Sequence, residues 1–333
     1  MSTATTDIER MARALQLAAS VRASAPPNPW VGCVIETVDG TVHEGATQPV
    51  GGPHAEVVAL SIADDVRGGT AWVTLEPCAH HGRTPPCADA LVAAGVARVV
   101  VALEDPDPRV AGQGIRRLRD AGIIVDVGIG ADPAAALLTP YLVQRRTGRP
   151  YVVLKLAASL DGRTAAPDGS SRWITGAEAR ANAHALRAES DAVLVGAGTV
   201  RADDPSLTVR DAPAPRGDPI RIVLGAAPAG ARVHPCLERT GDLGEVLDEL
   251  GSAGHLQLLV EGGATVAHAF HAGGLVDRYV LYLAPALFGG DDATGLFRGA
   301  GVASIDEVWR GQIRAVSRLG DDLRIDLDPK GAG

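Results

Sequence analysis

Two short segments constrain the fold of this chain more than any other feature. The first is Pro53-His54-Ala55-Glu56, and the second runs from Glu76-Pro77-Cys78 to Cys87. Each brings potential metal ligands to a point where a strand pattern gives way to a helix pattern. Helix N-termini present free N–H groups and a partial positive charge, which stabilise thiolates and bound anions. The pattern predicts an α/β fold whose strand-to-helix junctions carry a metal site.

Strand and helix patterns alternate through the first half of the chain. Apolar residues recur at helical spacing over 8–23, and further helices are expected over 55–63, 87–94, 115–121 and 131–144. The strands expected between them cover 31–38, 70–75, 96–103 and 123–129, with an Asp39-Gly40 turn and another strand after the first. This order predicts a mainly parallel sheet covered by helices.

A break in the pattern follows at 145–150, where three arginines, a glycine and a proline are typical of an exposed connector. A second α/β unit comes after it, with strands expected near 151–157, 192–195, 220–224, 256–260 and 279–283. The length of 333 residues also exceeds the usual size of one hydrophobic core. We therefore expect two domains, 1–147 and 148–333.

Composition excludes several classes of protein. The net charge of −9 disfavours a broad nucleic-acid or anionic-membrane surface. Four cysteines are too few for a disulfide scaffold, and the first residues show neither a signal peptide nor an apolar run of membrane-spanning length. We expect a cytoplasmic protein with a small-molecule partner, without nucleic-acid or membrane partners.

The candidate metal site fits zinc chemistry. His54, Cys78 and Cys87 offer three ligands to one Zn²⁺ per chain and leave the fourth tetrahedral position open, as a catalytic site requires. Zinc brings the pKa of water near neutrality, and in hydrolytic deaminases a carboxylate outside the ligand set moves the protons. Glu56, two residues after His54, is the candidate for that catalytic role.

Two other interpretations of these residues stay open. Single cysteines such as Cys78 and Cys87 are more often small core residues, and His54 could cap a helix. A structural zinc site would need a fourth ligand, which His43, His80 or His81 could supply. The order and spacing of the whole set favour the catalytic site.

The residues around the ligands resemble one family. The segments that carry the resemblance are Asn28-Pro29, Val31-Gly32-Cys33, His54-Ala55-Glu56-Val57 and 74–87, with His80-His81-Gly82-Arg83 inside the last. They closely resemble the deaminase half of the bifunctional riboflavin-biosynthesis deaminase/reductase. The eight residues between the two cysteines separate this family from deaminases with a Pro-Cys-x-x-Cys motif. The resemblance implies a cytidine-deaminase-like α/β/α domain that deaminates diaminohydroxyphosphoribosylaminopyrimidine.

The second half continues the resemblance. The matching segments are 155–163, Trp173-Ile174-Thr175, 198–205, 207–210 and Val260-Glu261-Gly262-Gly263. They are similar to the reductase domain of the same family, which implies a dihydrofolate-reductase-like α/β fold and NADPH as cofactor. The implied reaction is hydride delivery to C1′ of the opened ribose, which gives a ribitylamino-uracil phosphate. A homo-oligomer, dimer or tetramer, is also expected.

The resemblance implies site residues in both halves. In the deaminase, Asn28, His80 and Arg83 contact the phosphoribosylated pyrimidine. In the reductase, the implied substrate residues are Ser171, Arg187, Leu207, Arg210 and Glu261, and the implied cofactor residues are Ala157, Trp173, Thr199, Asp203, Gly262, Gly263, Ala264 and Thr265. The two reductase arginines suit a phosphate, and the two glycines suit a pyrophosphate. Taken singly, Asn28 could be a turn residue, Arg187 a solvated charge and Trp173 a core residue.

The chain departs from the family pattern at three places. Thr47 stands where relatives commonly carry a histidine, which puts one deaminase contact in question. Gly225-Ala226 replaces an Asp-Ser/Thr pair at the cofactor, and the 227–243 stretch is short, so that a strand there is expected to be missing or truncated. The altered cofactor region keeps one alternative open, a deaminase with a non-functional reductase-like domain. The other alternative, an assembly module with structural zinc, depends instead on a fourth protein ligand.

Overall fold

The computed structural model describes residues 3–80, 85–108 and 110–330. They form two compact units, Met1–Gly148 and Arg149–Gly333. Arg83, one of the implied deaminase residues, lies outside the described residues, as does His81.

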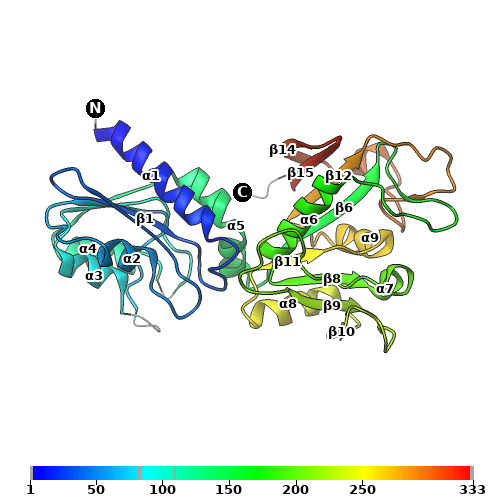
Figure 1. Cartoon of the computed structure of the whole chain (residues 1–333), viewed down its shortest axis with the longest axis horizontal. Helices are drawn as coiled ribbons and strands as arrows, with labels where there is room; N and C mark the ends of the chain where they lie inside the picture. The colour runs from blue at the N-terminus through cyan, green and yellow to red at the C-terminus, as the bar shows by residue number, and fades with distance from the viewer. Residues whose placement is uncertain (1–2, 81–84, 109, 331–333) are drawn as a thin grey trace. The chain divides into compact units, whose positions relative to one another are not determined.

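The first unit is a mixed sheet with helices on both faces (Figure 1). Its elements are α1 (Thr3–Ser20), β1 (Gly32–Glu36), β2 (Val42–Ala46), α2 (Ala55–Ser61), β3 (Thr70–Val73), α3 (Cys87–Ala94), β4 (Arg98–Val101), α4 (Gln113–Asp120), β5 (Ile124–Val127) and α5 (Ala131–Thr147). In these described residues the strand order is β2-β1-β3-β4-β5. Only β3, β4 and β5 run parallel, because β1 pairs antiparallel with both β2 and β3.

Apolar faces of the helices hold this sheet from both sides. Helices α1 and α5 lie on one face, and α2, α3 and α4 lie on the other (Figure 1). Met11 of α1 and Ala134 of α5 pack in one buried cluster with Val34, Trp72 and Val100 of the strands. Met11, Ala14 and Ala18 form the buried face of α1 at helical spacing, whereas Ile8, the first residue of the predicted stripe, is exposed.

The structure corrects the connector expected at 145–150. Helix α5 continues to Thr147 and ends at Gly148, whose φ of 76° is left-handed. Glycine is the usual residue at such a helix end, because it has no Cβ to clash there. Arg145 and Arg146 are therefore helical, and Arg145 is half-buried.

The second unit is built on one large sheet. Its elements are β6 (Tyr151–Ser159), β7 (Arg163–Ala165), α6 (Ala177–Glu189), β8 (Ala192–Gly196), α7 (Ala197–Asp203), β9 (Ile220–Leu224), β10 (Leu237–Arg239), α8 (Leu243–Ser252), β11 (Gln257–Val260), α9 (Ala264–Ala272), β12 (Arg278–Ala284), β13 (Thr294–Gly295), the 3₁₀ turn Ile305–Glu307, β14 (Gly311–Leu319) and β15 (Asp322–Pro329). The order is β10-β9-β8-β11-β6-β12-β15-β14 in the described chain. The strands from β10 to β12 are parallel, whereas β15 and β14 are antiparallel.

The two faces of this sheet carry different helices. Leu154, Leu194 and Leu258 belong to a buried cluster that includes Val246 of α8 and Phe270 of α9. Successive residues of a strand point to opposite faces of the sheet. Tyr282 of β12 points to the other face, where its hydroxyl donates to Asn182 of α6 at 2.7 Å. In the 227–243 stretch the strand is short: β10 has three residues.

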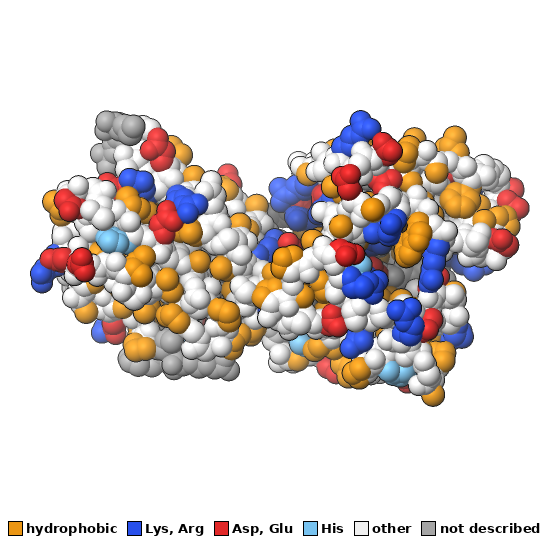
Figure 2. Space-filling view, viewed as in Figure 1, with side chains coloured by type: hydrophobic (Ala, Val, Ile, Leu, Met, Phe, Trp, Pro, Cys, Tyr) orange, Lys and Arg blue, Asp and Glu red, His pale blue; other side chains and the backbone are white. Residues whose placement is uncertain are grey.

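Charges are mixed on the molecular face shown in Figure 2, where basic and acidic side chains are interspersed over the second unit. No helix within the described ranges is long and apolar enough to cross a membrane.

Candidate functional sites

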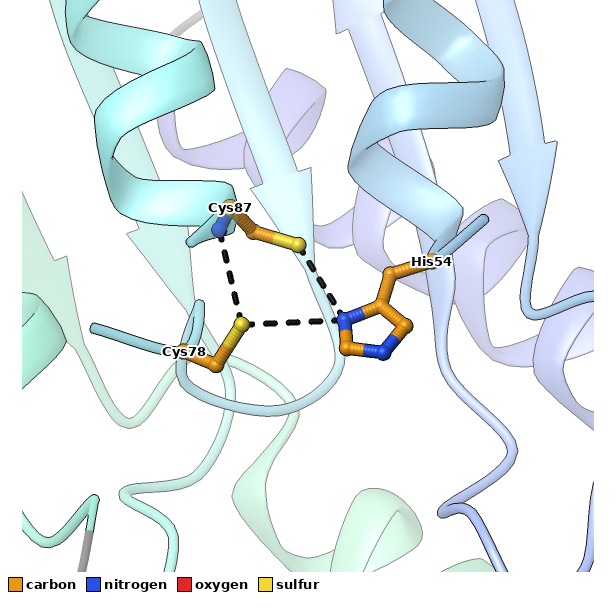
Figure 3. Close-up of side chains that lie close together, drawn as sticks. All are labelled: His54, Cys78 and Cys87. Carbon is orange, nitrogen blue, oxygen red and sulfur yellow. Dashed lines mark hydrogen bonds between the residues drawn. The ribbon is translucent and has the colours of Figure 1, made fainter. Parts of the chain in front are cut away.

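His54, Cys78 and Cys87 come together at two strand-to-helix connections (Figure 3). His54 is the N-cap residue of α2, Cys87 begins α3, and Cys78 lies in the loop after β3. Nδ1 of His54 is 3.2 Å from Sγ of Cys87 and 3.6 Å from Sγ of Cys78, and the three ligand atoms all lie within 4.8 Å of one another. Ligand atoms of a tetrahedral zinc site are roughly 3.5 Å apart, given bonds of about 2.0–2.3 Å. The spacing therefore fits a zinc ion.

The protonation of the two thiols also suits a cation. Hydrogen bonds with Cys87 and His54 lower the pKa of Cys78 to about 4, and the backbone N–H of Cys87 donates to the same sulfur at 3.4 Å. The neighbouring Cys78 and burial raise the pKa of Cys87. Because metal ligands must be deprotonated, we expect zinc binding by this pair to depend on pH.

The cluster has three members among the residues that the structure describes. His80 lines the adjacent cavity without joining the cluster, and His43 lies on β2. A structural zinc site normally has four protein ligands, whereas a catalytic one keeps a position for water. In the described part of the chain, the structural-zinc interpretation lacks its fourth ligand.

Glu56 lies beside the cluster without belonging to it. It is the second residue of α2, only 3% exposed, and lines the same cavity as His54 and Cys78. Burial, with a further contribution from the charge of Cys78, raises the pKa of Glu56 to about 7. A carboxyl group with a pKa near 7 can both accept and donate a proton at neutral pH.

The cavity next to the cluster has a volume of about 390 Å³. Asn28 and His80 line it, as the resemblance implies, and so does Thr47. The Thr47 hydroxyl accepts the backbone N–H of Val31 at 3.0 Å, so this side chain is fixed in the wall. The position that departs from the family pattern is therefore part of the site.

A second polar wall of this cavity is not singled out by the motifs. It consists of Asp105 and Asp107 after β4, and of Tyr141 and Arg145 on α5. The Tyr141 hydroxyl donates to Asp105 at 2.9 Å, and the Arg145 guanidinium lies over the Tyr141 ring with Nε 3.7 Å from Asp107. The sequence signal that could have indicated this wall is the place of the two aspartates after β4, because polar residues at the carboxyl ends of parallel strands gather at binding sites.

Glu76 ties the cysteine loop to this wall. Its buried carboxylate accepts backbone N–H groups from Gly112 at 2.9 Å, Gly114 at 2.8 Å, Ile115 at 3.1 Å and Asp105 at 3.2 Å. Two of these donors belong to the first turn of α4 and a third, Gly112, is its N-cap residue, which offers no side-chain cap. Glu76 thus satisfies donors that a helix N-terminus leaves without partners.

In the second unit, the residues implied for the reductase line two overlapping cavities, with the exception of Thr265. The larger, about 640 Å³, is lined by Ser171, Arg187, Leu207, Arg210 and Glu261, together with Trp173, Thr199 and Asp203. The smaller, about 250 Å³, shares Trp173, Asp203 and Glu261 and adds Ala157, Gly262, Gly263 and Ala264. Thr265 is the second residue of α9, directly after Ala264. The site lies where ligands bind in open α/β sheets, at the carboxyl ends of strands such as β11.

Arg187 and Glu261 form a buried ion pair in the larger cavity. Arg187 donates to the two carboxylate oxygens at 2.8 and 3.0 Å. Burial by itself raises the pKa of Glu261, but Arg187 and Lys155 hold it below its usual value. A solvated surface charge is therefore the wrong interpretation of Arg187. Trp173 is likewise no core residue, since it is 70% exposed with the Arg180 guanidinium 4.7 Å from its ring.

Family comparisons agree with the two sites. The RibD C-terminal domain matches residues 150–324, and the cytidine and deoxycytidylate deaminase zinc-binding region matches residues 4–103. The riboflavin biosynthesis protein RibD of Escherichia coli (strain K12) is 42% identical over 359 residues, which cover 95% of this chain and 98% of the relative. The chain belongs to the RibD family. RibD of Mycobacterium tuberculosis (strain ATCC 25618 / H37Rv) is also 42% identical, over 96% of both chains.

Solved RibD structures share the fold over nearly the whole length. Form 2 of Acinetobacter baumannii RibD has a TM-score of 0.92 at 40% identity and covers 99% of this chain and 100% of its own. The diaminohydroxyphosphoribosylaminopyrimidine deaminase/5-amino-6-(5-phosphoribosylamino)uracil reductase of Thermotoga maritima has a TM-score of 0.89 at 30% identity, with coverages of 98% and 100%.

These relationships confirm the predicted family and fold class: a cytidine-deaminase-like domain is followed by a reductase-like domain. As a RibD-family member, the chain is a bifunctional deaminase/reductase of riboflavin biosynthesis with a zinc-binding deaminase region. The roles of the individual site residues stay predictions.

Proposed function

We propose that the first unit deaminates diaminohydroxyphosphoribosylaminopyrimidine and that the second unit reduces the ribosyl group of the product with NADPH. The observation that carries the proposal is the cluster of His54, Cys78 and Cys87 with Glu56 buried beside it. The substrate assignment draws on the Thermotoga maritima relative, a deaminase and reductase of such compounds. The domain boundary falls near residue 148, between the two compact units.

In the deaminase, His54, Cys78 and Cys87 would hold one zinc ion per chain. When bound, zinc supplies the Lewis acidity that lowers the pKa of a water molecule. Glu56 accepts a proton from the attacking water and returns protons to the ring nitrogen and the leaving amine. Asn28 and His80 position the pyrimidine, and Arg83 binds the phosphoribosyl portion. Metal analysis of the purified protein should find one zinc per chain.

In the reductase, Trp173, Thr199 and Asp203 bind the cofactor together with Ala157 and the segment 262–265. NADPH supplies the hydride. Ser171, Leu207 and Arg210 bind the substrate, with the exposed Arg210 at its phosphate. Arg187 acts on the substrate site by fixing Glu261, to which it donates two hydrogen bonds.

The test is incubation of the purified chain with the diaminopyrimidine phosphoriboside, with and without NADPH. We expect ammonia release in both cases, and NADPH oxidation that follows it. Absence of ammonia release would refute the deaminase assignment. Ammonia release without NADPH binding at millimolar cofactor would favour a non-functional reductase-like domain. A homo-oligomer and a cytoplasmic location stay predictions, and light scattering of the purified protein tests the first.

A further inference from the structure

The loop 204–211 at the reductase cavity has an unusual backbone. Asp204, Leu207 and Asp211 have φ angles of 41°, 52° and 57°, and they are the non-glycine residues with positive φ in the described ranges. Such conformations are unfavourable for residues with a Cβ and persist only where surrounding contacts hold them. Leu207 and Arg210 of this loop line the cavity. The shape of the substrate site therefore depends on the contacts that hold the loop.

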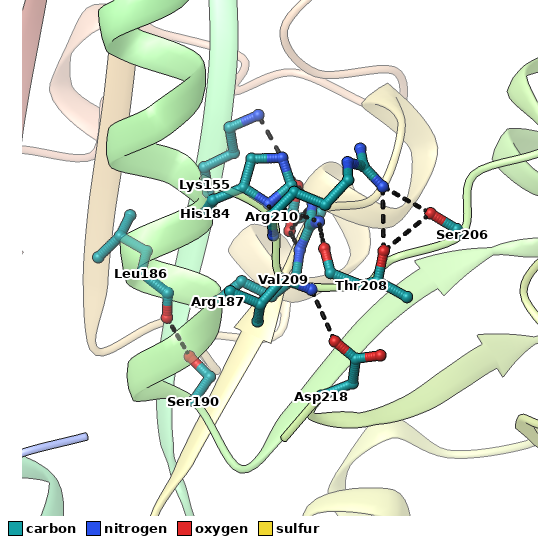
Figure 4. A network of polar contacts seen from close by, with 11 residues as sticks. Lys155, His184, Leu186, Arg187, Ser190, Ser206, Thr208, Val209, Arg210 and Asp218 are labelled. Carbon is teal, nitrogen blue, oxygen red and sulfur yellow. Dashed lines mark hydrogen bonds and ion pairs between the residues drawn. The ribbon is translucent and has the colours of Figure 1, made fainter. Parts of the chain in front are cut away.

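Two of these contacts come from one turn of α6 (Figure 4). Arg187 donates through Nη1 to the carbonyl oxygen of Thr208 at 2.6 Å. The backbone N–H of Arg210 donates to Nδ1 of His184 at 3.1 Å. Because a backbone N–H can only donate, Nδ1 of His184 is an acceptor, and a neutral imidazole carries its hydrogen on Nε2. This tautomer follows from the geometry alone.

We propose that neutral His184 is a positioning residue of the reductase, which holds the loop 204–211 by accepting the Arg210 N–H. The inference rests on the proposed function of the second unit. His184 is 9% exposed and lines the same cavity as Arg210. It acts on the substrate through the loop, because its Nδ1 is engaged by backbone and not by ligand.

Protonation of His184 would undo this contact. A hydrogen on Nδ1 removes the acceptor and places a cation 3.3 Å from Nη1 of Arg187. The charged groups that face His184 are Arg187 on α6, Arg210 and Asp211 on the loop, and Glu261 after β11. Burial and the two arginines hold the pKa of His184 below its usual value, against the opposite effect of the two acids. The contact is thus intact at neutral pH and is lost on acidification.

Two substitutions distinguish the contribution of the Nδ1 acceptor from that of the rest of the His184 side chain. His184→Asn keeps an acceptor near the position of Nδ1 and does not titrate, whereas His184→Ala removes it. With the deaminated substrate, we expect His184→Ala to raise KM about tenfold at neutral pH, the effect of one lost hydrogen bond, with little change in kcat. His184→Asn should stay within about threefold of wild type and lose the rise in KM that the wild type shows on acidification.

His255→Asn is the matched control, because His255 precedes the amino end of β11 and the cavity lies at its carboxyl end. Equal losses in His184→Ala and His184→Asn, or a fall in kcat without a change in KM, would overturn the proposal. An unchanged KM in His184→Ala would overturn it as well.

Hydrogen exchange of the loop amides gives a readout without substrate. We expect faster exchange of the Arg210 amide in His184→Ala than in wild type, and wild-type exchange in His184→Asn. Unchanged exchange in His184→Ala overturns the positioning role. A wild-type protein that does not oxidise NADPH with the deaminated substrate would instead refute the proposed function, and the two failures are therefore distinguishable.

Discussion

Burial raises the pKa of a carboxyl group, and a cation buried beside it can reverse the net shift. Burial, together with the negative charge of Cys78 near Glu56 and of Asp328 near Asp277, raises the pKa values of these two acids to about 7 and about 6. Glu261 is buried too, yet Arg187 and Lys155 keep its pKa below the usual value. At the residue scale, the chain thus raises the pKa of one buried acid toward neutrality and favours the ionised form of another.

Asp277 gives a prediction for stability. Its carboxylate accepts the backbone N–H of Val152 at 2.7 Å, which an asparagine can also accept. Because the folded-state pKa is raised to about 6, ionisation destabilises the folded protein as pH rises from about 4 through 6. Asp277→Asn should therefore stabilise the protein by up to roughly 3 kcal/mol above pH 7, and the gain should vanish near pH 4. Urea unfolding across this range measures it, and a gain that does not change with pH would contradict the account.

Site residues in contiguous motifs were predictable from the sequence, and residues brought together by tertiary structure were not. His54, Cys78 and Cys87 stand in short patterns with a known chemical meaning. Tyr141 meets Asp105 only because α5 packs beside the end of β4, and no local pattern marks that contact. Arg145 was misplaced in a connector, since arginines followed by glycine and proline usually indicate exposure.

At the scale of elements, one glutamate joins two parts of the deaminase site. Glu76 follows β3 and caps the N-terminus of α4, whose preceding loop carries Asp105. The same chain segment continues into Cys78. A single carboxylate thus links the chain segment of Cys78, a candidate metal ligand, to the loop that carries Asp105 of the cavity wall.

Glu76→Gln should impair the deaminase selectively. The amide has one acceptor oxygen for four N–H donors and turns its own NH₂ toward the rest, which costs about 1–3 kcal/mol of stability for each donor left without a partner. We expect ammonia release to fall at least about tenfold, with NADPH oxidation on deaminated substrate unchanged. Glu104→Gln, at an exposed position in the loop between β4 and α4, is the control. If the Glu76→Gln variant releases ammonia at the wild-type rate and melts at the wild-type temperature, the proposed role of Glu76 in holding the deaminase site is wrong.

The periodicity of apolar residues predicted the order of the helices and strands, but it did not predict the residues at which they begin and end. The expected 31–38 strand is observed as β1, Gly32–Glu36, and the expected turn at Asp39-Gly40 leads into β2, which pairs antiparallel with it. The antiparallel pairing of β1 with β3 departs from the mainly parallel sheet. Direction is decided by connections and pairing rather than by local pattern. The hairpin of β14 and β15 was not expected, because most of β14 is exposed and lacks the buried-strand pattern.

On the scale of the whole molecule, each unit contains its own core and its own candidate site. The cavity beside the zinc cluster is lined by residues of the first unit, and the cavities around Glu261 are lined by residues of the second. RibD-family relatives cover both units in one chain. The two activities are therefore expected to be separable by single substitutions.

The Glu56→Gln variant tests this claim most directly. In one preparation of it, ammonia release is measured with the diaminopyrimidine substrate, and NADPH oxidation is measured with the deaminated substrate. The account predicts that zinc content and the reductase rate stay at wild-type values, while ammonia release falls about 10²–10⁴-fold with the loss of the proton-transfer group. Ammonia release at the wild-type rate, or loss of NADPH oxidation on deaminated substrate, would contradict it.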